Sequence, residues 1–190
     1  SLDAGFKREN VLLVSTDPEM IGYRGRQIAE LYQRLLERIK TIPGVRSVSL
    51  LDNGLVSGGA SVSSVHIQGR SPRPGENSFI DSPHFSAVGT EYFETIGMTI
   101  LRGRGFTAQD NERAPKVAVI NETFARYYFG DEDPIGRCLG RFSNNFEIEI
   151  VGVVNDAKYR SLREQIPRTY YVPYLQTGGS WRRTTFQIRA

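Results

Sequence analysis

The chain has 190 residues, of which 39% are hydrophobic and 24% are charged, and this composition excludes an intrinsically disordered protein. The formal net charge is only +3 and the arginines alternate with acidic residues, which favours a solvated surface over a nucleic-acid-binding patch. No apolar stretch approaches the roughly 20 residues that a helix needs to cross a bilayer. The single cysteine, Cys138, excludes an internal disulfide and is compatible with either the cytosol or the bacterial periplasm.

The start of the chain predicts a β-α-β unit. Residues 11–16 are mostly apolar and are predicted to form a buried strand. Between about 23 and 41, apolar residues recur with helical period on one face, and Pro43 with Gly44 ends the helix. Residues 45–51 then form a second strand.

After a glycine- and serine-rich loop at 53–61, short elements alternate quickly along the chain. Two further helices are predicted over 90–96 and 121–129, with Thr90 and Asn121 as their N-caps. Pro173 places its strand at a sheet edge or at the strand's own end. The pattern predicts an α+β fold with two lobes, each a small sheet with helices on one face. The predicted strands cover residues 65–68, 79–85, 98–101, 117–120, 137–139, 146–154, 169–174 and 184–188.

Histidine and cysteine do not occur with the spacing of a metal or nucleophile site. Neither a phosphate-binding P-loop nor a Gly-x-Ser-x-Gly elbow is present. His66 alternates with Val65 and Ile67 and is expected on the exposed side of a strand, whereas His84 is expected in a loop. Cys138 is expected to be buried in a strand.

Other chemically suggestive residues have simpler structural interpretations. Glu147 and Glu149 are expected to share one solvated strand face, and Asp131-Glu-Asp133 lacks the ligand spacing of a calcium loop. Gly58-Gly59 does not lead into a helix, and Arg102-Gly-Arg-Gly105 is expected to be a tight turn. At least two of Tyr170, Tyr171 and Tyr174 are expected to pack inward. We therefore predict no catalytic, cofactor-binding or metal-binding residue and no enzymatic activity.

Short motifs distributed along the chain occur in a specific order. Together they resemble the periplasmic core domain of MacB-type, FtsX-like ABC-transporter permeases. Three segments, Gly5-Phe6, Gly54-x-x-Ser-Gly-Gly59 and Lys158-Tyr-x-x-Leu-Arg163, resemble the duplicated orphan permeases of Acidobacteria. The ordered motifs are Gly5-Phe6-x-x-Glu-Asn-Val-Leu12, Tyr32-x-x-Leu-Leu-x-Arg-Ile-x-x-Ile-Pro-Gly-Val45, Ser82-Pro-x-Phe85, Tyr92-Phe-x-Thr-Ile-Gly97, Leu101-x-Gly-Arg-x-Phe106, Val117-Ala-Val-Ile-Asn-Glu-x-Phe-Ala-Arg126, Pro134-Ile-Gly136, Ile150-Val-Gly-Val-Val-x-Asp156 and Tyr171-x-Pro-Tyr174.

The resemblance implies a porter-like lobe made of residues 1–80 and 147–190, with a Sabre-like lobe inserted at 81–146. It implies a position between two transmembrane helices, on the periplasmic side of the bacterial inner membrane. The implied partners are the protein's own membrane helices, a cytoplasmic ATP-binding subunit or domain, a periplasmic adaptor or substrate protein, and a second copy of the permease; no nucleic acid is implied. Family porter lobes continue with a further helix and strand, so this lobe is expected to be incomplete at Ala190.

The sequence is compatible with three functions. A transport-coupling domain would relay ATP-driven helix motion to the two lobes. A passive binding module for a peptide, lipid or lipoprotein would need an apolar groove between the lobes, lined by Phe93, Phe106 and Tyr174. A hydrolase or isomerase would need a buried ionisable cluster. Solvated loops are the expected setting of four arginines that could otherwise mark a partner surface, Arg102, Arg104, Arg182 and Arg183.

Overall fold

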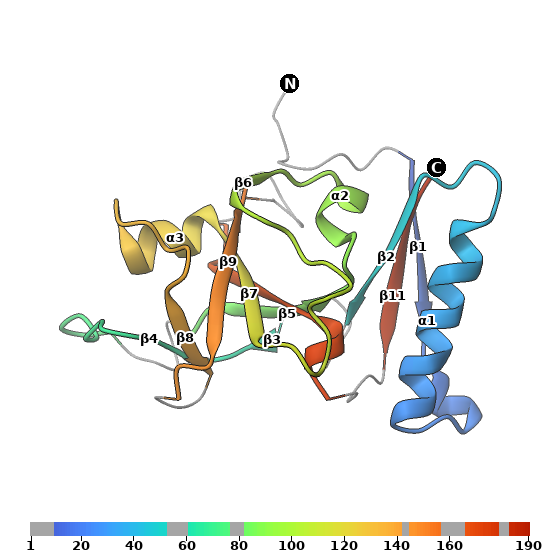
Figure 1. The fold of residues 1–190 in the computed structure, drawn as a ribbon, viewed down its shortest axis with the longest axis horizontal. Coiled ribbons are helices and arrows are strands. Elements are labelled where there is room, and N and C mark those ends of the chain that lie inside the picture. The colour runs from blue at the N-terminus through green and yellow to red at the C-terminus, as the bar shows by residue number, and fades with distance from the viewer. Residues whose placement is uncertain (1–9, 53–60, 77–81, 142–144, 157–165, 179–182) are drawn as a thin grey trace.

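A computed structural model describes residues 10–52, 61–76, 82–141, 145–156, 166–178 and 183–190. The described strands form one sheet in the order β1-β11-β2-β5-β10-β7-β9-β8-β4, with β3 added to β5 and β6 added to β9 (Figure 1). This mixed architecture confirms the predicted α+β class. The elements are β1 (Val11–Thr16), η1 (Pro18–Ile21), α1 (Arg26–Lys40), β2 (Ser47–Asp52), β3 (Ser61–Val62), β4 (Val65–Ile67), β5 (His84–Val88), α2 (Tyr92–Ile96), β6 (Ile100–Gly103), β7 (Lys116–Asn121), α3 (Glu122–Phe129), β8 (Cys138–Arg141), β9 (Ile148–Val154), β10 (Thr169–Pro173), η2 (Tyr174–Gln176) and β11 (Thr184–Arg189).

At one end of the sheet, α1 covers β2 and β11. Its apolar face buries Ile28 and Tyr32, and the Tyr32 ring meets Phe186 of β11 edge-on, with ring centroids 5.6 Å apart. The neighbouring strand β1 was predicted to be buried, and this is wrong, because Leu12 and Leu13 are 61% and 62% exposed. β1 stands last in the strand order and pairs with β11 alone among the described strands, so its outer edge and much of both faces stay uncovered.

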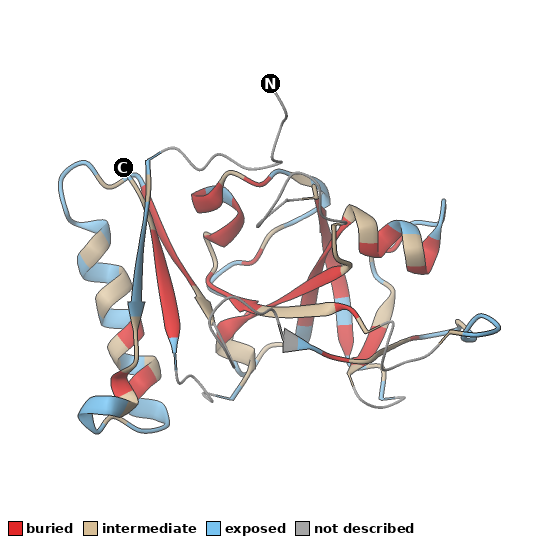
Figure 2. Cartoon of the chain, turned by 180° about the vertical axis from the view of Figure 1, so that it is seen from behind, coloured by how far each residue is buried: buried red, intermediate tan, exposed pale blue. Residues whose placement is uncertain are grey.

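The middle of the sheet is covered on both faces, as the buried central strands in Figure 2 show. β10 lies between β5 and β7, and all five of its residues are buried. Its alternating side chains enter two different cores: Tyr170 packs on the side of α1 and α3, and Tyr171 on the side of α2. Tyr174 is buried as well, so all three tyrosines pack inward and the expectation of at least two is confirmed.

Pro173 is the last residue of β10 and is tolerated there for a specific reason. β10 pairs with β7 only at Tyr170 and Tyr171, so the missing N–H of Pro173 removes no bond of that ladder. The alternative that placed Pro173 at the end of its strand is confirmed. The alternative that placed the strand at a sheet edge is wrong.

The helix caps follow the sequence in one case and depart from it in the other. Asn121 caps α3 as predicted: its Oδ1 accepts from the N–H of Phe124 at 3.0 Å and also from the N–H of Thr169 at 2.9 Å. The cap therefore ties α3 to β10. α2 begins after Glu91 without a side-chain cap, so the prediction of Thr90 as its N-cap is wrong.

The strand pairing crosses both predicted lobe boundaries. β4, from the first segment of the porter-like lobe, pairs with β8 of the inserted segment, and β9 pairs in parallel with β7. The division into residues 1–80 with 147–190 and an inserted 81–146 stays a prediction.

The backbones of β6 and β9 approach each other closely at two glycines. Gly103 has a φ of +69°, and a Cβ atom on it would lie 2.1 Å from the Val151 carbonyl oxygen. Gly152 lies opposite in the pairing, and a Cβ atom there would lie 2.1 Å from the Arg104 carbonyl oxygen. Just beyond the pair, the Arg104 N–H donates to Val151 O at 2.9 Å. Only glycine fits at either position.

Candidate functional site

The two histidines and the cysteine lie on three different strands. His66 is half-buried on β4, so it is less exposed than predicted, and Cys138 is a free, half-buried thiol at the start of β8, where full burial was expected. His84 begins β5, so its assignment to a loop is wrong. Among the described residues, no group of three or more histidine, cysteine and acidic side chains could hold a metal ion.

The acidic residues singled out in the sequence are exposed and mostly paired with basic side chains. Glu147 and Glu149 are both exposed, as predicted, and Glu147 forms an ion pair with Lys116 at 2.6 Å. Glu132 pairs with Arg137 at 3.0 Å, and Asp133 accepts from the N–H of Ile135 at 3.2 Å. The Gly58-Gly59 loop and Arg182 lie outside the described residues.

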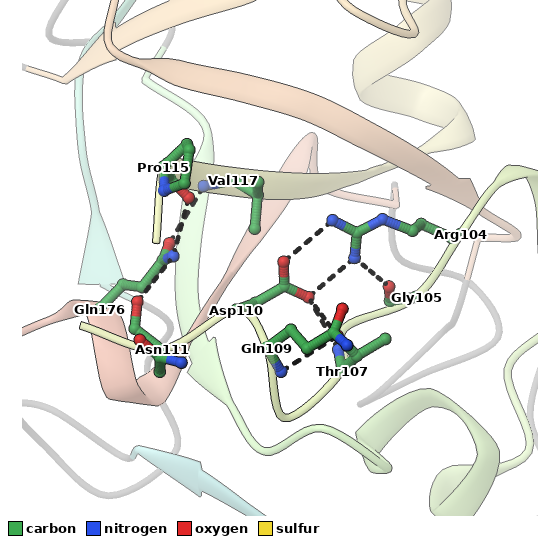
Figure 3. A network of polar contacts seen from close by, with 9 residues as sticks. All are labelled: Arg104, Gly105, Thr107, Gln109, Asp110, Asn111, Pro115, Val117 and Gln176. Atoms are coloured by element: carbon green, nitrogen blue, oxygen red, sulfur yellow. Dashed lines mark hydrogen bonds and ion pairs between the residues drawn. The ribbon is translucent and has the colours of Figure 1, made fainter. Parts of the chain in front are cut away.

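The loop after β6 is organised by the Asp110 carboxylate (Figure 3). Its oxygens accept from both terminal nitrogens of Arg104, at 2.7 and 2.9 Å, and from the N–H of Thr107 at 2.8 Å. Burial alone would raise the pKa of Asp110, but these hydrogen bonds outweigh it and hold the pKa below its usual value. Arg104, placed in a solvated loop by the sequence, is 46% exposed but is held by this ion pair. The network folds the loop and presents no open coordination site.

The same loop is tied to the segment after β10 by Gln176. Its Nε2 donates to the carbonyl oxygens of Asn111 and Pro115, and its Oε1 accepts from the N–H of Val117 at 3.0 Å (Figure 3). The side chain thereby satisfies backbone groups where β7 begins.

The apolar groove predicted between the lobes is not formed by the three residues assigned to it. Phe93 and Phe106 are buried together on the α2 side of the sheet, with ring centroids 5.8 Å apart. Tyr174 is buried on the other side, where its hydroxyl hydrogen-bonds Gln33 of α1. The predicted groove lining is wrong because the sheet separates Tyr174 from Phe93 and Phe106.

Two hollows of the described surface lie beside β4 and its following loop. One of about 580 Å³ and one of about 160 Å³ share His66 and Arg70 in their walls, and the smaller one also includes Glu76 and Tyr128. Arg70 and Glu76 form a two-bonded ion pair at 3.1 and 2.7 Å with side chains only 16% and 10% exposed. Hydrogen bonds from the Arg70 guanidinium lower the pKa of Glu76, whereas burial raises the pKa of Tyr128 to about 12.

No motif in the sequence predicts this site. Its signal is weak: an arginine and a glutamate six residues apart on either side of Pro72 and Pro74. Arg70 and Glu76 meet only because the turn between them brings the two residues together. The arrangement can hold a charged or polar group by hydrogen bonding, and it offers no nucleophile activated by a neighbouring base.

Among the described helices, none combines the length and the apolar character needed to span a membrane.

Comparison with known proteins gives a consistent result. A model of the MacB-like periplasmic core domain family matches residues 1–190. The chain is 30% identical over 98 residues to the macrolide export ATP-binding/permease protein MacB of Mannheimia succiniciproducens, and 29% identical over 80 residues to that of Aggregatibacter actinomycetemcomitans. These matches cover 52% and 42% of this chain but only 15% and 12% of the relatives.

The fold has clear counterparts among solved structures. The periplasmic region of MacB from Actinobacillus actinomycetemcomitans superposes with a TM-score of 0.62 at 18% identity, covering 97% of this chain and 76% of that one. The extracellular domain of the noncanonic ABC-type transporter YknZ from Gram-positive bacteria gives a TM-score of 0.55 at 16% identity, covering 83% and 72%. Sequence and fold agree with the resemblance seen in the motifs, and the chain belongs to the MacB-like periplasmic core domain family.

Proposed function

We propose that this chain is the extracytoplasmic domain of an ATP-driven permease and that it couples motion of the membrane helices to the handling of a substrate outside the membrane. In addition to the family membership, one observation supports the proposal: the first and last described residues of the chain are neighbours. The Ala190 N–H donates to the Asn10 carbonyl at 3.0 Å, so both lie at one end of the molecule (Figure 1). A domain held at one end by two membrane helices can receive their motion as a unit.

The proposal also covers the cellular location of the domain and the proteins that it works with. The domain would stand on the periplasmic side of the bacterial inner membrane, attached to its own transmembrane helices and served by a cytoplasmic ATP-binding subunit or domain. A second copy of the permease and a periplasmic adaptor or substrate protein complete the proposed assembly. The two relatives named as macrolide exporters make a macrolide the natural probe of transport.

The contact between α2 and the α1–β2–β11 end is the proposed site of relative motion. The polar contacts between these parts include the ion pair of Lys40 with Glu91 and the hydrogen bond that Arg189 Nε donates to the Thr95 carbonyl at 2.7 Å. The sheet face beneath α2 is polar, and three of its buried atoms lack a hydrogen-bond partner among the described residues: Ser47 Oγ, Ser49 Oγ and Gln187 Oε1. The same is true of Thr95 Oγ1 on α2. Unsatisfied buried polar groups lower the free energy that this contact gains over a shifted arrangement of α2. A contact made of apolar groups would resist such a shift more strongly.

Cross-linking tests this coupling. In the full permease carrying C138S, K40C and E91C would be joined by a bismaleimide with a cleavable disulfide spacer. We expect erythromycin transport into inverted vesicles to fall at least about fivefold and to recover on reduction, because closure steps gate such cycles. The matched control is R26C/E30C, cross-linked within α1 at an i,i+4 pair. Unchanged transport at complete 40–91 cross-linking would refute the coupling role.

The alternative, a passive binding module for a peptide, lipid or lipoprotein, is less well supported. Its main requirement was an apolar groove lined by Phe93, Phe106 and Tyr174, and all three side chains are buried in the cores.

A further inference from the structure

The paired strands β2 and β11 have one apolar face and one polar face. Their register places Ser47 opposite Arg189 and Ser49 opposite Gln187 on the same face, whereas the apolar residues between them pack in the core under α1. α2 contacts both strands from the other side, so β2 and β11 lie between the two helices (Figure 1). Strands with this alternation normally turn their polar side chains to water. Here the polar face is covered by α2.

The polar face beneath α2 is almost completely removed from solvent. Ser47, Ser49 and Gln187 are only 6%, 1% and 4% exposed, and Thr95 on α2 is 0% exposed. Ser47 Oγ, Ser49 Oγ, Thr95 Oγ1 and Gln187 Oε1 have no hydrogen-bond partner among the described residues. Each buried polar atom of this kind lowers stability unless something supplies the missing bond. Four such atoms on two facing elements therefore indicate a ligand that lies between them.

The chemistry of the four atoms selects the ligand. Three are hydroxyl oxygens, which donate or accept, and the fourth is the amide oxygen of Gln187, which only accepts. None of the four carries a charge, so a metal cation would gain no counter-charge from them, and the amide oxygen would repel an anion. Water both donates and accepts, and a buried water makes about three hydrogen bonds to groups of this kind. Residues directly opposite each other, such as Ser49 and Gln187, have Cβ atoms about 5 Å apart, a span that a water can bridge.

Direct contacts hold both ends of α2 on this face. The segment before the helix comes close at Gly89, where an added Cβ would lie 2.6 Å from Ser49 Oγ. Near the other end, Arg189 Nε donates at 2.7 Å to the carbonyl of Thr95, which lies in the last turn, where helix carbonyls lack a donor of their own. Because the Gly89 backbone covers Ser49 on one side, a water must approach Ser49 Oγ from the side of Gln187.

We propose that ordered water molecules bridge the polar face of β2 and β11 to α2, with Ser49, Thr95 and Gln187 among their partners, and that this hydrated contact lets α2 shift against the sheet. Water-mediated bonds are exchanged one at a time, and breaking them exposes no apolar surface, so a shift costs less than it would across an apolar core. The role in motion rests on the proposed function, whereas the hydration rests on the four atoms alone.

A crystal structure of the 190-residue chain at atomic resolution tests the hydration. We expect at least one ordered water molecule at about 2.7–3.2 Å from two or more of the four atoms. Direct hydrogen bonds among the four side chains, or a contact that holds no water, would overturn the proposal.

Hydrogen exchange in the same chain tests whether the hydrated contact loosens α2. The variant T95V/Q187M, called the apolar variant below, keeps the size of both side chains and removes two of the polar partners. Exchange of the N–H groups of Gly97 and Met98, which bond to carbonyls of α2, should slow at least about fivefold, because an apolar contact holds the helix more strongly. The N–H groups of α3 are the internal reference and should change by less than about twofold.

The matched control is T41V/Q27M, which makes the same two replacements at exposed positions at the end and the start of α1. It should leave the exchange of Gly97 and Met98 unchanged. If the apolar variant does not fold, S47A/S49A makes the same comparison. Equal exchange in the wild type and the apolar variant would show that the polar contact does not loosen α2, and it would overturn the role in motion.

Transport by the full permease connects the contact to the cycle. The apolar variant should transport erythromycin at least about threefold more slowly, because a more strongly held α2 shifts less often, whereas T41V/Q27M should transport like the wild type. Wild-type transport by an apolar variant whose α2 exchanges more slowly would also contradict the role in motion. Failure of the cross-linking test would refute the proposed coupling but would not alter the water positions in the crystal structure, so the two failures are distinguishable.

Discussion

Replacing Gly103 by alanine is expected to lower the free energy of unfolding by about 4 kcal/mol, the combined cost of a left-handed backbone and of steric overlap, each about 1–3 kcal/mol. The added Cβ would lie 2.1 Å from Val151 O, so β6 could remain only by moving away from β9. Loss of the Arg104–Val151 backbone bond and loosening of the loop after β6 should follow. Urea unfolding monitored by circular dichroism measures the change.

Gly136 supplies the matched control because it has a similar φ of +78° and no atom within 4 Å of an added Cβ. G136A should lower the free energy of unfolding by only about 1–2 kcal/mol, which is the cost of a left-handed backbone at a residue other than glycine. G152A, which meets Arg104 O at 2.1 Å, should resemble G103A. Equal losses for G103A and G136A would show that the close approach of β6 and β9 contributes nothing.

Replacing Asp110 by alanine is expected to cost about 2–3 kcal/mol at pH 7, because it leaves the N–H of Thr107 and the Arg104 guanidinium without their acceptor. The cost is below that of a fully buried ion pair since Arg104 is partly exposed. The control D133A removes a carboxylate that is mostly exposed, lies 3.8 Å from Arg102 and accepts one exposed hydrogen bond from the N–H of Ile135, and it should change stability by less than about 1 kcal/mol.

The same carboxylate makes stability depend on pH. The pKa of Asp110 is lowered in the folded state, so its stabilisation is present above the unfolded value of about 3.9 and is lost as pH falls through the folded pKa. Unfolding by urea at pH 7 and pH 3 should show a smaller difference for D110A than for the wild type. Part of the difference should remain, because the pKa of Glu76 is lowered too. Identical pH dependence of D110A and the wild type would contradict this assignment.

The periodicity of apolar residues and the capping residues predicted several individual helices and strands correctly. The apolar period over 23–41 indicated α1, which begins slightly later, at Arg26, after Gly25 with its φ of +48°. The predicted strand over 146–154 corresponds to β9, and Asn121 caps α3 because a short side chain at that position reaches the third following N–H.

Properties set by distant partners could not be read from the sequence. β5 and β10 pair in parallel although the paired residues are 85 positions apart in the chain, as in Thr169 and His84, and no local signal encodes that choice. The exposure of β1 depends on which strand lies beside it, because apolar periodicity alone does not separate a central strand from an edge strand. The contact of Arg168 with the ring of Tyr127, whose centroid lies 4.1 Å from the guanidinium carbon, could not be predicted for the same reason, since the two residues meet only in the folded chain.

A distance measurement in the full permease tests the central claim, that the ATP cycle moves one part of this domain against the other. Spin labels at R26C and E94C would report the distance between α1 and α2, and labels at R26C and T41C would report the length of α1, a rigid reference. With ADP replaced by a non-hydrolysable ATP analogue, the 26–94 distance distribution should shift while the 26–41 distribution stays unchanged. An unchanged 26–94 distribution in a permease that hydrolyses ATP would contradict the coupling account.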